Sequence, residues 1–83
     1  MDKQSHFLLR NESSRPLVLN IEPEGAFVPL NGGEEVSVRD TFLNDPVTLK
    51  VSISDKEGPI ISIWPGDGEV KVEKGGVDVL DFM

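Results

Sequence analysis

A chain of 83 residues has room for one hydrophobic core, and its lack of cysteine excludes disulfide bonds and zinc sites built on thiolates. Fifteen acidic residues against eight basic ones give a net charge of −7, which argues against binding to nucleic-acid phosphates. No apolar stretch is long enough for a signal peptide or a membrane span. We therefore expect one cytoplasmic domain over residues 1–83, with residues 1–5 forming a frayed terminus.

The apolar residues predict strands throughout the chain. They do not recur at the spacing of a helix, and glycine and proline punctuate the sequence. Short apolar runs return every 8 to 12 residues, which is typical of a sandwich or a barrel. The expected strands cover residues 7–10, 16–22, 26–30, 35–39, 47–54, 59–64, 70–72 and 77–82. The fold class is therefore all-β, a small antiparallel sandwich or barrel of seven or eight short strands joined by tight turns.

Two features in the first half predict how strands are placed. Pro29 cannot donate a ladder hydrogen bond, so the strand at residues 26–30 should lie at a sheet edge. The residues Asn31, Gly32 and Gly33 favour positive φ angles. We expect them to form a tight hairpin between this strand and the one at residues 35–39.

The clearest strand is the segment 47–54. Four apolar residues alternate in it with Thr48, Lys50, Ser52 and Ser54; they are Val47, Leu49, Val51 and Ile53. Strict alternation is typical of a strand with one face on the core and one face in water. We expect this strand to bury its apolar face.

The segment 59–64 differs, because it is apolar on both faces. If Ile61 and Ile63 face the core, Ile60 and Trp64 face the other way. The segments 7–9 and 79–82 share this two-sided character. Three interpretations remain open: Trp64 closes the end of the core as a lid, it belongs to an exposed patch that meets a partner, or it stacks on a sugar.

No catalytic constellation is visible. His6 has no companion for a triad or a zinc site, and no serine lies in a nucleophile elbow. Asn11 begins a glycosylation tripeptide, but it is better explained as a residue that bonds the backbone of its own turn. We expect no enzyme activity, no cofactor and no metal centre.

The function expected from the sequence is that of a small acidic interaction or accessory domain, able to associate with itself. Its interaction patch is predicted at Ile60, Trp64, Leu80 and Phe82, with a protein partner or a second copy as the ligand and no nucleic acid or membrane. The alternative is a small ligand- or cation-binding domain that uses the acidic loops around Asp40, Asp55 and Asp67.

Overall fold

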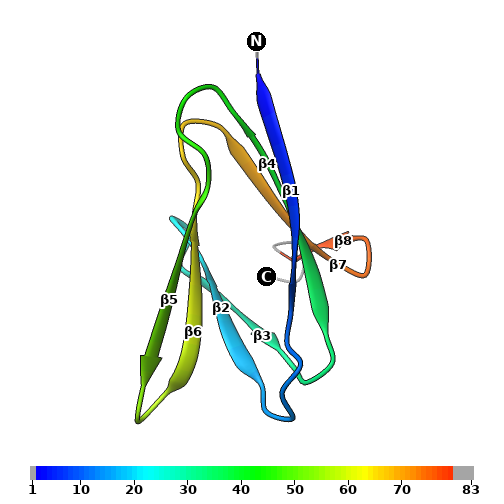
Figure 1. Cartoon of the computed structure of the whole chain (residues 1–83), viewed down its shortest axis with the longest axis vertical. Helices are drawn as coiled ribbons and strands as arrows, with labels where there is room; N and C mark the ends of the chain where they lie inside the picture. Colours follow the sequence, from blue (N-terminus) through cyan, green and yellow to red (C-terminus); the bar gives the residue numbers. More distant parts are fainter. Residues whose placement is uncertain (1, 80–83) are drawn as a thin grey trace.

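Eight strands form two four-stranded sheets in the computed structural model, which describes residues 2–79 (Figure 1). The strands are β1 (Lys3–Arg10), β2 (Leu17–Ile21), β3 (Ala26–Leu30), β4 (Glu35–Phe42), β5 (Thr48–Ser54), β6 (Gly58–Trp64), β7 (Glu69–Lys74) and β8 (Val77–Asp78). The all-β prediction is confirmed, and the architecture is a two-sheet sandwich rather than a closed barrel. Within residues 2–79, no helix is long and apolar enough to cross a membrane.

The two sheets differ in the direction of their strands. Sheet A has the order β1-β4-β7-β8 and is antiparallel throughout. Sheet B has the order β3-β2-β6-β5, and its two central strands, β2 and β6, run parallel. This parallel pair departs from the wholly antiparallel expectation. It arises because the chain crosses between the sheets before it forms the β5–β6 hairpin.

The hairpin expected at residues 31–33 is absent, because β3 and β4 lie in different sheets. The turn itself is present, and Gly33 adopts the expected positive φ of 84°. A Cβ at Gly32 would meet the carbonyl oxygen of Ser13, so this crossover packs closely against the β1–β2 connection. Turn residues show where the chain reverses. They do not show which sheet the next strand joins.

The core lies between the sheets and is built from strands that alternate as the sequence predicts. Its buried apolar residues are Leu19, Ile21, Ala26, Leu30, Val36, Val38, Ile63, Val72 and Val79. Within sheet A, Val38 lies opposite Phe7 on one side and Val72 on the other. At the other end of β1, residues 3–5 pair with residues 40–42, although we expected this terminus to be frayed.

The strand β5 forms where the alternation predicts it, but the predicted burial of its apolar face is wrong. Every residue of β5 is exposed: Leu49 is 37% exposed, Val51 62% and Ile53 79%. Of the four alternating apolar residues, Val47 alone packs against the core. The reason is position, because β5 is the last strand of sheet B and the β5–β6 hairpin points away from β1 and β4 (Figure 1).

Candidate functional site

Two of the four residues predicted to form the interaction patch, Ile60 and Trp64, lie on the strand β6. Ile63 is fully buried and Ile61 packs against the core, so Ile60 and Trp64 lie on the outer face of sheet B, as expected. Trp64 is 45% exposed and does not form a buried lid. Leu80 and Phe82, the other two predicted members, lie outside the described residues.

Polar side chains divide this outer face. Ser62 separates Ile60 from Trp64 on β6, and the two residues are about 13 Å apart along the strand at 3.3 Å per residue. Ile60 is half-buried and lies opposite Val18 of β2. Phe27, which is 65% exposed, lies in the cross-strand row that also holds Asn20 and Ser62. The outer face therefore does not join Ile60 and Trp64 into one continuous patch.

A continuous apolar row lies instead on the opposite face of sheet B, along β5. Leu49 pairs with Ile63 and Val51 pairs with Ile61, so these two side chains of β5 continue the core-facing side of the sheet. Leu49, Val51 and Ile53 follow one another at every second residue of β5, and all three are exposed. We call these three residues the β5 row.

The backbone polar groups of the β5 row face the open edge of sheet B. The carbonyl of Ile63 accepts a hydrogen bond from the amide of Glu22, at 2.9 Å on the β2 side, and so turns away from β5. Leu49, opposite Ile63, therefore occupies a position that is not hydrogen-bonded to β6. Its N–H and C=O point outward, and by alternation so do those of Val51 and Ile53.

The other sheet edges are less suited to pairing with a further strand. Pro29 removes a donor from the edge strand β3, which confirms the sequence prediction for this strand, and β8 has only two residues. The inward residues of β1, such as Phe7 and Leu9, pack against the core. The strand β5 has seven residues, no proline and an exposed apolar row. Among the described edges it is therefore the best suited to pairing with a further strand.

Two carboxylates hold the crossover that leads from β4 to β5. The buried Asp40 accepts a hydrogen bond from the amide of Val47 at 2.8 Å. Asp67 accepts from the amides of Leu43 at 2.9 Å, Asn44 at 2.8 Å and Asp45 at 3.1 Å. These backbone hydrogen bonds, that of Leu43 foremost, hold the pKa of Asp67 below its ordinary value. Both carboxylates thus stabilise the backbone of this crossover by accepting its amide hydrogen bonds.

The acidic loops proposed as a cation site do not all meet. The amide of Asp67 donates to the carbonyl of Asp45 at 3.0 Å, so these two loops touch at one end of the sandwich. Asp55 follows β5, whereas Asp45 precedes it, and a seven-residue strand separates the two. Within residues 2–79, no group of three or more histidine, aspartate or glutamate side chains is placed to hold a metal ion.

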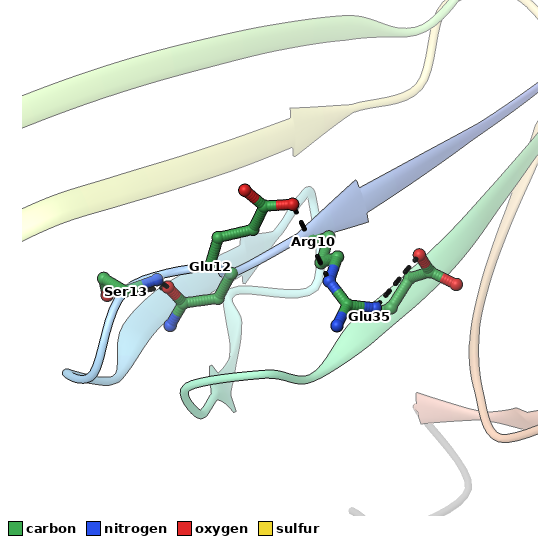
Figure 2. Close-up of polar contacts among 5 residues, drawn as sticks. Arg10, Glu12, Ser13 and Glu35 are labelled. Atoms are coloured by element: carbon green, nitrogen blue, oxygen red, sulfur yellow. Dashed lines mark hydrogen bonds and ion pairs between the residues drawn. The ribbon is translucent and has the colours of Figure 1, made fainter.

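Asn11 anchors the β1–β2 turn. Its side-chain amide donates to the carbonyls of Arg15 at 2.7 Å and Leu30 at 2.8 Å, while its Oδ1 accepts from the amide and hydroxyl of Ser13. These hydrogen bonds confirm the prediction that Asn11 bonds the backbone of its own turn, and the residue is buried. Figure 2 shows Ser13 of this turn and the exposed Arg10, whose Nε and Nη1 atoms lie 3.9 Å from Oε1 of Glu12 and from Oε1 of Glu35, respectively.

Two depressions lie on the surface of residues 2–79. One of about 510 Å³ is lined by residues 4–6 and 39–41, and one of about 550 Å³ lies between the β1–β2 and β5–β6 turns. The first contains His6, which has Arg39 opposite it on β4.

Comparison of the chain with protein-family models, curated proteins and solved structures returned no match.

Sequence reasoning missed the two features that define this region, the open β5 edge and the brace at Asp40. A signal for Asp40 was present, because it continues the inward positions of Val36 and Val38 at the same two-residue spacing. No comparable local signal marks β5 as uncovered. Its pattern is that of a strand with one buried face.

Proposed function

We propose that this protein is a small non-enzymatic interaction domain that binds an extended segment of a protein partner along the edge of β5. The observation that carries this proposal is the exposed β5 row, whose three apolar side chains lie beside outward-facing backbone groups. Main-chain hydrogen bonds at a sheet edge provide affinity, and side chains at alternate positions provide specificity.

Exposure of the row supports a binding role over a purely structural one. Isolated apolar residues are common on protein surfaces, but a long apolar edge strand normally carries proline, a bulge or inward charges that prevent pairing. Between Thr48 and Ser54 the single charged residue is Lys50, and its side chain lies on the opposite face from the row. The edge is therefore open to a strand from another chain.

The proposal is tested by selecting peptides from a random displayed library on the immobilised full-length protein. We expect enrichment of extended peptides with alternating apolar residues, and loss of their binding in Val51→Lys. Phe27→Lys is the matched control, because it changes an equally exposed apolar residue on the other face of sheet B. Failure to enrich such peptides, or equal binding by Val51→Lys and wild type, would overturn the proposal.

The cation-binding alternative has weaker support. The carboxylate of Asp67 is already engaged by three backbone amides, and Asp55 lies at the far end of β5. A calcium titration separates the two proposals. A rise in Tm that Asp45→Asn abolishes would favour the alternative, and an unchanged Tm would remove it.

A further inference from the structure

We infer that the partner strand is β5 of a second copy of this chain, joined antiparallel around a two-fold axis at Val51. The two copies of sheet B would then form one continuous sheet. This inference rests on the proposed function and deepens it by naming the partner. It follows from the direction of the free backbone groups, from the register and from the charge of the strand.

The free backbone groups of β5 suit antiparallel self-pairing. Leu49, Val51 and Ile53 turn their N–H and C=O groups outward, as the hydrogen bond from Glu22 to Ile63 requires. In an antiparallel pair, residues that bond each other must both be of this outward kind. A two-fold axis at Val51 satisfies this condition, since it places Val51 opposite its own copy and Leu49 opposite Ile53 of the second copy.

The side chains select this register over its neighbours. With the axis at Val51, all seven residues of β5 are paired and Lys50 lies opposite Ser52 of the second copy. An axis at Lys50 would set the two ammonium groups directly opposite each other, which is destabilising. An axis at Ser52 would place Leu49 opposite Asp55 and shorten the pairing. The β5 sequence is therefore best matched to itself around Val51.

Charge opposes self-contact only weakly at this strand. Each chain carries a net charge of −7, so two copies repel each other over most approaches. The strand β5 contains no acidic residue and the single cation Lys50, so the strand itself adds no acidic repulsion to the contact. The contact is small, below about 1,200 Å², so a weak dimer with a dissociation constant on the order of 10–100 µM is expected.

Sedimentation equilibrium of the full chain measures this association. We expect a mass that rises from monomer to dimer with concentration, and a dissociation constant that falls when added salt screens the charge. Val51→Lys should raise the dissociation constant by on the order of 30-fold or more, because symmetry places the new charge opposite its own copy. Phe27→Lys should leave it unchanged. Equal association of wild type and Val51→Lys would overturn the inference.

Cysteine cross-linking tests the register directly, because the chain has no cysteine of its own. Under mild oxidation Val51→Cys should form a covalent dimer, since residue 51 faces its own copy. Leu49→Cys alone should not, because the two copies of residue 49 lie about 13 Å apart, beyond the reach of a disulfide. A mixture of Leu49→Cys with Ile53→Cys should cross-link.

The outcomes separate this inference from the proposed function. A monomer at millimolar concentration, or no preference for Val51→Cys over Leu49→Cys, overturns the self-pairing. Library peptides that still bind wild type and not Val51→Lys would in that case leave the interaction function standing with another partner. Circular dichroism of each variant confirms that loss of pairing does not reflect loss of fold.

Discussion

The strands β4 and β5 follow each other in the chain and have the same alternating pattern, yet they differ in burial. In β4, Val36 and Val38 are almost completely buried, whereas in β5 Val51 is 62% exposed. The difference is that β4 is an inner strand of sheet A and β5 is the last strand of sheet B. Alternation shows which residues share a face. Whether that face is covered depends on the opposite sheet.

The largest expected effect comes from replacing, one at a time, two leucines on the core-facing side of sheet B. Leu19 is fully buried and Leu49 is 37% exposed. We expect Leu19→Ala to lower the free energy of unfolding by about 2–5 kcal/mol, because it leaves a cavity. Leu49→Ala should cost about 1 kcal/mol or less. Urea denaturation of dilute protein measures both values, and equal costs would mean that β5 is covered.

The next effect concerns the crossover that leads from β4 to β5. A Cβ at Gly68 would overlap the carbonyl oxygen of Thr41 and lie 2.8 Å from the Cα of Phe42, both at the end of β4. We expect Gly68→Ala to lower the free energy of unfolding by about 1–3 kcal/mol, since backbone must move to admit the methyl group. Glu69→Ala, an exposed neighbour, is the control. An unchanged free energy of unfolding in Gly68→Ala would show that Gly68 packs less closely against the end of β4 than described.

A smaller effect on stability depends on pH through Asp67, which accepts backbone hydrogen bonds from the same crossover. Its pKa is lowered by backbone hydrogen bonds, so its stabilisation is present above the unfolded pKa near 3.8 and is lost as the pH falls through the lower folded pKa. Asp67→Asn should therefore lower Tm at neutral pH, and the gap from wild type should narrow below about pH 4. Asp55→Asn serves as the control. A gap that persists at low pH would contradict this role.

The smallest effect is expected at Ile53, the most exposed residue of the β5 row at 79%. Ile53→Thr keeps the β-branched shape and removes apolar character. We expect a change within about 0.5 kcal/mol in the free energy of unfolding of the monomer. Thermal unfolding at low concentration measures it, and a loss comparable to that of a core substitution would place Ile53 against an unseen neighbour.

The sequence predicted the local features of this molecule well. The strands that hold the buried Leu19 and Val38 were predicted at residues 16–22 and 35–39, and the edge position of β3 followed from Pro29. These properties depend on side-chain periodicity and on the missing amide of proline, which are written in the residues themselves. The split of Ile60 and Trp64 from Ile61 and Ile63 followed for the same reason.

The features that sequence reasoning missed are all non-local. Gly33 marks a turn, but the assignment of β3 and β4 to different sheets depends on contacts between distant strands. The exposure of Val51 depends on how far sheet A reaches over sheet B. The candidate site followed this division, because the residues on the outer face of β6 were placed correctly while the open row on β5 was taken for core.

Residue-resolved amide hydrogen exchange at Val51, compared with Val38, tests the central claim most directly. The structure places the Val51 amide at an open edge and Val38 in a buried inner strand. We predict fast exchange at Val51 in dilute protein, slow exchange at Val38, and protection of Val51 that grows with protein concentration. Protection of Val51 equal to that of Val38 in dilute protein would contradict the account.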